Sequence, residues 1–324
     1  MKRLSVALLI LCSCASEPGQ YNPSVDPVPL KFGGARSAAA VDDAGLTEFH
    51  YLTYDHVTGN WSGEFGGLAL PDDESPGTFL PADASRVYWP EGKNYSFYAA
   101  GYNSNVSVGE DDVEFGTSMM LYSSGTSALL VLKNPGHNVD WMAAKTLRQG
   151  KIRGIPLNFR HIAARVRTVS FDLSEYLDWI RDRELDIADI KLVTLDMTDA
   201  DEQNYVFSPE SGSLFTRQSY DYGSSASHML MQDRMLGLVR GGDAFDVSYY
   251  AFAGIHSIAL RVQTVDESGR QVIDDRSFSA SLTLPMGGDC EIRIKILPDD
   301  RDLHLEVTFG IEDWQSGGSG TVNE

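Results

Sequence analysis

The residues with the most specific chemistry are two cysteines close to the amino terminus, Cys12 and Cys14. Lys2 and Arg3 precede an apolar run over residues 4–11, which is the layout of a secretory signal and is too short to cross about 30 Å of hydrocarbon. A cysteine directly after the cleavage point is what a bacterial lipoprotein requires, because its thiol takes the diacylglycerol. We therefore predict a signal over residues 1–14 with lipid on Cys14. An ordinary signal cut near Ala15 is the alternative.

The third cysteine, Cys290, has no partner within the chain once Cys12 is removed with the signal and Cys14 carries lipid. An internal disulfide is therefore not expected. Cys290 begins an alternating run, Cys-Glu-Ile-Arg-Ile-Lys-Ile, which is typical of a strand. We predict a packed or edge thiol rather than a catalytic one.

The histidines show no spacing that would bind zinc. The nucleophile elbow, the phosphate loop and the dinucleotide fingerprint are also absent from the sequence. His161, beside a predicted strand, is assigned a structural role. We predict that the chain is not an enzyme and has no cofactor or metal site. The seven histidines are His50, His56, His137, His161, His228, His256 and His304.

The charge is strongly acidic, with 46 Asp and Glu against 26 Lys and Arg. Such a surface repels phosphates, which argues against nucleic acid as a partner. Acidic clusters fall beside turn residues and are predicted to be solvated loops, with a loose calcium site as the alternative. They lie at residues 72–74, 110–112, 199–202 and 299–302.

Aromatic residues supply a second alternative, because those on loops could stack on sugars. The candidates are Trp61, Tyr102, Tyr220 and Tyr222. The alternative function is therefore that of a surface lipoprotein that binds glycans without polymerising.

Most of the chain alternates with period two, which predicts strands packed on one face. The clearest run is residues 276–284, where Phe278, Ala280, Leu282 and Leu284 oppose serines and a threonine. Two such sheets face to face make an antiparallel β-sandwich. One helix is predicted over residues 175–185, capped by Ser174, with Leu173, Leu177 and Ile180 facing inward. Further strands are expected at residues 47–54, 95–100, 119–122, 128–132, 155–159, 165–173, 189–197, 247–252, 257–265, 291–297 and 303–311.

A chain of 324 residues fits two domains better than one. Residues 15–45 read as an extended leader, because 17–29 carries four prolines and 33–40 is small and flexible, with Arg36 as its one charge. We predict an N-terminal domain over 46–155 and a C-terminal domain over 156–324.

Several segments together resemble the fimbrillin-like family of surface lipoproteins, which build type V pili. Each match is short, but they occur in family order over nearly the whole chain. The segments are the signal with Cys14, Pro29-Leu30-Lys31-Phe32 followed by Arg36, Val87-Tyr88-Trp89-Pro90 with Tyr95–Tyr102, Asp140-Trp141-Met142-Ala143-Ala144 with Ile155–Val166, and Trp314 with Gly317.

The resemblance implies two transthyretin-like antiparallel β-sandwich domains with one or two short helices. It implies export as an outer-membrane lipoprotein to the cell surface and the fimbrium, where an arginine-specific protease removes the leader at Arg36–Ser37. A strand from another pilus subunit then fills the opened groove. An exposed linker charge is the alternative for Arg36.

The family pattern and this sequence differ near the carboxyl terminus. A donor strand there would alternate apolar residues, whereas residues 315–324 are polar and glycine-rich. We therefore expect an accessory or tip subunit rather than a bulk stalk subunit. Its adhesion partner would be a protein or a glycan on the surface of a host cell or of another bacterium, and the sequence does not distinguish these.

Overall fold

The computed structural model describes residues 30–33, 46–82, 89, 92–103, 118–133, 139–150, 154–220, 225–238, 240–297 and 304–310. Within these ranges the chain is mostly β-strand, with several antiparallel sheets and a single helix. This confirms the predicted all-β class. Cys14, Arg36 and Ser37 lie outside the described residues, so the predictions made for them stay predictions.

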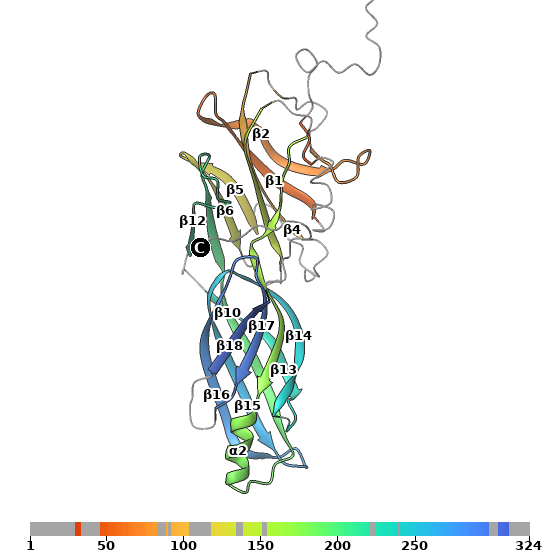
Figure 1. Cartoon of the computed structure of the whole chain (residues 1–324), viewed down its shortest axis with the longest axis vertical. Helices are drawn as coiled ribbons and strands as arrows, with labels where there is room; N and C mark the ends of the chain where they lie inside the picture. The colour runs from red at the N-terminus through yellow and green to blue at the C-terminus, as the bar shows by residue number, and fades with distance from the viewer. Residues whose placement is uncertain are drawn as a thin grey trace, which may run out of the picture.

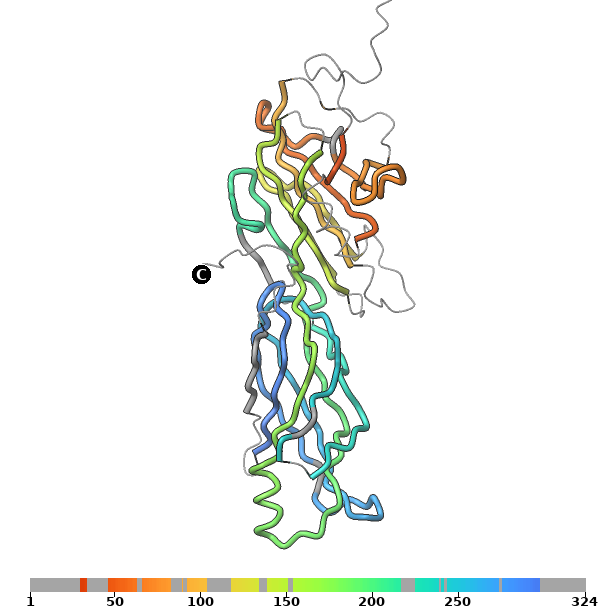
Figure 2. The backbone as a smooth tube through the Cα atoms, turned by 45° about the vertical axis from the view of Figure 1, so that its right-hand side comes forward, coloured from red at the N-terminus to blue at the C-terminus, as the bar shows by residue number. Residues whose placement is uncertain are grey.

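The molecule is elongated, with two pairs of sheets placed end to end (Figures 1 and 2). In the upper half of Figure 1, a six-stranded sheet has the order β3-β2-β1-β4-β7-β8 and a four-stranded sheet the order β12-β11-β6-β5. The strands of the larger sheet are β1 (Leu46–Asp55), β2 (Asn60–Pro71), β3 (Phe79–Pro81), β4 (Tyr95–Asn103), β7 (Trp141–Gln149) and β8 (Arg160–His161). Those of the smaller sheet are β5 (Met119–Ser124), β6 (Ser127–Lys133), β11 (Glu202–Phe207) and β12 (Arg217–Tyr220).

The lower half contains two four-stranded sheets, ordered β13-β10-β15-β16 and β14-β9-β17-β18. Central strands β9 and β17 pair in parallel, which departs from the antiparallel sandwich expected. Parallel neighbours need a long crossover, and the chain from β10 to β16 supplies it. The strands are β9 (Ala163–Asp172), β10 (Asp189–Ala200), β13 (Ser225–Met235), β14 (Gly241–Phe252), β15 (Gly254–Val265), β16 (Gln271–Leu284), β17 (Asp289–Lys295) and β18 (His304–Gly310).

Burial follows the predicted alternation. Phe278, Leu282 and Leu284 of β16 point into the lower core, while the serines between them are exposed. Strand β4 is an exception, because nearly every residue in it is buried. Its sheet lies between two apolar clusters, with Tyr98 in one and Phe97 in the other. Both faces of this strand are therefore core.

The helix α2 (Ser174–Asp182) lies at the far lower end of the molecule (Figure 1). It begins at Ser174 instead of being capped by it. The carboxylate of Asp172 accepts hydrogen bonds from the Ser174 backbone N–H at 3.1 Å and hydroxyl at 2.6 Å. Leu173 and Ile180 are buried as predicted, and Tyr176 joins them.

Two expectations for the strands need correction. Residues 155–159 do not form a strand, because only Ile155 makes a bridge and Pro156 has no N–H to continue one. In addition, strands β2, β3, β7, β8, β11, β12 and β13 were not predicted. The boundary near residue 155 remains a prediction. Beyond it in sequence, however, β11 pairs with β6 and β12 pairs with β11, so both strands belong to an upper sheet.

Candidate functional site

The candidate site is the place where residues 30–33, here called the leader strand, join the upper half (Figure 2, red). On one side, Phe32 donates its N–H to the Phe79 carbonyl at 2.9 Å and accepts from the Phe79 N–H at 3.0 Å. On the other side, Ile155 donates to the Lys31 carbonyl at 2.9 Å and accepts from Gly33 at 2.8 Å. The leader strand thus runs antiparallel to β3 and parallel to the backbone at Ile155.

The side chains of Leu30 and Phe32 fill the apolar core on that face of the six-stranded sheet. They are 2% and 1% exposed. The Phe32 ring meets Tyr51, Phe49 and Phe97 edge-on, with ring centroids 4.6, 5.3 and 5.9 Å away. Aromatic pairs in this geometry contribute beyond the area they bury. The leader strand is therefore part of the core.

Lys31, between these two apolar residues, points the opposite way and pairs with Asp72. The distance from Nζ to Oδ2 is 2.9 Å, and the Asp72 side chain is only 6% exposed. The Lys31 hydrogen bond is the main reason that the pKa of Asp72 lies below its ordinary value, with further help from the Glu74 N–H. Asp72 is therefore a nearly buried anion whose cation comes from the leader strand.

Gly33 ends the leader strand in a conformation that side chains rarely adopt, with φ +92°. A Cβ at this position would lie 2.6 Å from the carbonyl oxygen of Gly77. The backbone approach at this point requires a glycine. We use the name leader seat for the residues that receive the leader strand, namely Phe49, Tyr51, Asp72, Gly77, Phe79, Phe97 and Ile155.

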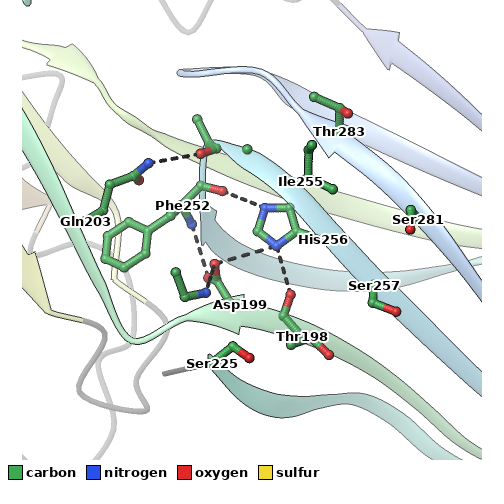
Figure 3. A pocket seen from close by; sticks show the side chains of 13 residues that line it. Thr198, Asp199, Gln203, Ser225, Phe252, Ile255, His256, Ser257, Ser281 and Thr283 are labelled. Atoms are coloured by element: carbon green, nitrogen blue, oxygen red, sulfur yellow. Dashed lines mark hydrogen bonds and ion pairs between the residues drawn. The ribbon is translucent and has the colours of Figure 1, made fainter. Parts of the chain in front are cut away.

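A second polar cluster lies where the two halves meet, beside a cavity of about 350 Å³ (Figure 3). The ring of His256 lies 2.8 Å from the carbonyl oxygen of Phe252 and 3.0 Å from that of Thr198. Asp199 lies 3.6 Å from the same ring and accepts hydrogen bonds from the N–H groups of Phe252 and Ala200. Burial raises the pKa of the Asp199 carboxyl above its ordinary value.

This cluster connects strands of both halves. Gln203 of β11 donates to the Ala253 carbonyl at 3.1 Å and accepts from the Tyr205 hydroxyl at 2.7 Å. Because its polar groups satisfy one another, we assign the cluster a structural role. The acidic residues at 199–202 and 72–74 were predicted to be solvated, but Asp199 and Asp72 are buried. The acidic clusters at 110–112 and 299–302 lie outside the described residues.

Three residues that the sequence analysis considered for a functional role instead make packing or hydrogen-bond contacts within the fold. Cys290 is buried in the lower core, where burial raises the pKa of its thiol to about 12, so the thiolate that chemistry requires is suppressed. His161 contacts the buried Asp140 at 2.8 Å, in keeping with a structural role. Trp61 of β2 packs on Tyr54 of β1 and Tyr98 of β4, and its indole N–H donates to the Gly125 carbonyl.

The aromatic residues proposed for sugar stacking are not gathered on a loop. Trp61 lies in β2, Tyr102 in β4 facing Trp141, and Tyr220 in β12, while Tyr222 lies outside the described residues. The sequence signal placed them on loops because no alternation marks these strand ends. Nothing in the described part of the chain favours a glycan platform built from them.

Within the described residues, no three His, Cys, Asp or Glu side chains come together in a way that could hold a metal ion. No helix there has the length and apolar character needed to cross a membrane.

Comparison with known proteins gives structural likeness only. No family model matches the chain, and no curated protein gives a significant sequence match. A candidate cell adhesion protein from Bacteroides uniformis shows 14% identity and a TM-score of 0.49, over 91% of this chain and 100% of its own. A fimbrial protein from Bacteroides vulgatus shows 12% identity and a TM-score of 0.46, over 87% and 98%. The tip fimbrial protein Mfa3 from Porphyromonas gingivalis shows 11% identity and a TM-score of 0.34, over 88% and 99%.

Proposed function

We propose that this chain is a structural or adhesive subunit of a cell-surface fimbrium, assembled by strand exchange after its leader is removed. The observation that carries the proposal is the seating of the leader strand. Four backbone hydrogen bonds and two buried apolar side chains hold residues 30–33 in the upper half. A segment held in this way leaves a ready-made acceptor for another strand when it departs.

The proposed cleavage point suits this exchange. Arg36 follows Gly33 by three residues, so cutting between Arg36 and Ser37 would place the whole leader strand on the released piece. The backbone groups of Phe79 and Ile155 would lose their partners, and an apolar groove would open beside Phe49, Tyr51 and Phe97. Unpaired strand edges of this kind drive pairing with another chain.

Lipid on Cys14 completes the proposal. The lipid would hold the precursor at the outer membrane, and cleavage at Arg36 would separate the folded chain from its anchor. Other pilus subunits are then the partners, and catalysis has no part in the role. The sequence resemblance favours this assembly, and we propose an accessory or tip subunit rather than a bulk stalk subunit.

The experiment is to identify the amino terminus of the protein sheared from native cells by mass spectrometry, for the unchanged chain and for Arg36→Ala. We expect a chain beginning at Ser37 in the fibre fraction, and retention of Arg36→Ala on cells with an acylated Cys14. Arg181→Ala, at an arginine whose side chain is 67% exposed on α2, is the matched control and should assemble normally.

An acylated Cys14 within assembled fibres would reject leader removal, and normal assembly of Arg36→Ala would reject the cleavage point. The ratio of this chain to the other subunits in the same fibres tests its position. A large excess of this chain would reject the accessory or tip assignment.

A further inference from the structure

We infer that the leader seat reads a four-residue pattern, so that a replacing strand must present an apolar residue, a cation, an aromatic residue and a glycine in that order. This inference rests on the proposed strand exchange and goes further by defining the partner. The pattern is that of Leu30-Lys31-Phe32-Gly33, and each position is set by a different contact in the leader seat.

The cation position is set by Asp72. Its carboxylate is nearly buried and bonded to Lys31, and it stays with the seat when the leader leaves. Thr78 and the Glu74 N–H also bond to it, but neither carries a positive charge. The exposed neighbours Asp73 and Glu74 add negative charge to the same loop. A strand with a neutral or acidic residue here would cover Asp72 without neutralising it, which is costly for a buried charge.

The apolar and aromatic positions are set by the core. Phe32 occupies the space between the rings of Phe49, Tyr51 and Phe97, and Leu30 is equally buried. A smaller residue at the Phe32 position would leave a cavity with both a transfer cost and a packing cost. An aromatic ring therefore fits this position best.

The glycine position is set by the backbone conformation and by the close approach of Gly77. Any side chain at Gly33 would collide with the Gly77 carbonyl, and φ +92° is itself unfavourable for other residues. The register is also fixed, because alternate residues face opposite sides of a strand. A slip by one position would turn the cation into the core and the aromatic ring toward Asp72.

The sequence of this chain shows how selective the pattern is. An aromatic residue precedes a glycine at five places, and the residue before each pair is Lys31, Glu64, Glu114, Asp221 or Thr308. Only Lys31 is a cation. Val307-Thr308-Phe309-Gly310 in β18 meets the other three requirements but has threonine at the cation position. We therefore expect the natural partner to be a different chain that carries Lys or Arg at this position.

The test uses the full chain with a site-specific protease sequence inserted after Gly34, so that cutting separates the leader strand from the rest of the chain. Labelled peptides of residues 28–33 with Lys, Gln or Glu at position 31 then compete for the seat, and anisotropy reports binding. We expect the Lys peptide to bind about tenfold tighter than the Gln peptide, with the Glu peptide weakest. A peptide of residues 305–310 should bind no better than the Gln peptide.

Variants of the leader seat test whether Asp72 causes the preference for lysine. Asp72→Asn should reduce the preference for Lys to about twofold or less, and Asp72→Lys should reverse it in favour of Glu. Asp73→Asn, at the exposed neighbouring residue, is the matched control and should keep the preference. A peptide with alanine for Gly33 should bind about tenfold more weakly than its parent.

The possible failures are distinguishable. If the Lys, Gln and Glu peptides bind equally well, the pattern is wrong while strand exchange stands. If no peptide enters the seat, strand exchange fails and the inference fails with it. A double-mutant cycle of Lys31→Gln and Asp72→Asn in the uncut chain gives an independent measure, and additive effects on unfolding would overturn the role of Asp72.

Discussion

At the scale of single residues, Lys31 and Phe32 make different contacts on opposite sides of one short strand. Phe32 supplies buried apolar surface, and Lys31 supplies charge to Asp72. A pair with a nearly buried anion contributes little by itself, but losing one partner is costly because the other stays uncompensated. The leader strand is thus held firmly by packing and selected by charge.

The Asp72 pair makes the seat sensitive to acid. Its pKa in the folded chain lies below the ordinary value of 3.8, chiefly because of Lys31. A carboxyl of this kind stabilises the fold above its unfolded pKa, and the contribution is lost as the pH falls through the folded pKa. We expect hydrogen exchange at the Phe32 amide to accelerate below about pH 4, beyond its intrinsic pH dependence. The Asp72→Asn chain should lack this acceleration, and an identical profile in both chains would contradict the assignment.

Phe32→Ala should weaken the fold by about 3 kcal/mol, because it removes a large buried side chain and leaves a cavity among three rings. Urea unfolding monitored by tyrosine and tryptophan fluorescence measures this change. Val57→Ala is the control, since Val57 is 58% exposed and its truncation should change stability by less than about 0.5 kcal/mol. Equal effects of the two substitutions would mean that the leader strand adds nothing to the core.

At the scale of elements, the junction between the halves depends on strands that change sheets. Strand β10 belongs to a lower sheet, and β11 begins two residues later in an upper one. The polar contacts of Asp199 and His256 occur at this transition, where regular pairing stops and backbone groups need other partners. The buried charge therefore replaces missing ladder hydrogen bonds.

Asp199→Ala should destabilise the chain by about 3 kcal/mol, because it leaves the Phe252 and Ala200 N–H groups without their acceptor and removes the carboxylate beside His256. Urea denaturation of purified protein gives the value. Asp196→Ala provides the comparison, since Asp196 lies on the same strand but on its half-buried outer side. A loss at Asp199 no larger than that at Asp196 would show that the junction does not depend on the carboxylate.

At the scale of the whole molecule, the leader strand belongs to one half only. The lower half has its own apolar core, which contains Ile292, Phe278 and Tyr176, whereas Leu30 and Phe32 join a separate cluster in the upper half. The helix α2 lies at the opposite end of the long axis (Figure 1). Removal of the leader should therefore act locally.

Releasing the leader strand from the cut chain should remove protection from hydrogen exchange at Phe79 and Ile155, whose N–H groups bond to it. Amides of β15, deep in the lower half, should keep theirs, because their pairing with β10 and β16 is unchanged. Hydrogen exchange with mass spectrometry compares the chain before and after release. A loss of protection throughout the molecule would mean that the two halves unfold together.

The sequence alone determined the features that depend on local pattern. Period-two alternation located most strands of the lower half, and Ile292, Ile294 and Ile296 are buried as that pattern required. Cys290 was predicted to be a packed or edge thiol, and it is buried in the lower core. Strands β7 and β13 were not predicted because their sequences alternate weakly. Apolar cores cover both faces of the sheet that contains β7, and β13 lies at the edge of its sheet.

Only the tertiary structure decided which distant residues meet. Lys31 and Asp72 are 41 positions apart, and nothing local marks an acidic loop residue as the partner of a leader lysine. The same holds for Asp199, which was predicted to be solvated but is buried at the end of β10 against His256 of β15 and the Phe252 N–H of β14. Charge and burial depend on what packs against a residue, and strand pairing over long separations sets that packing.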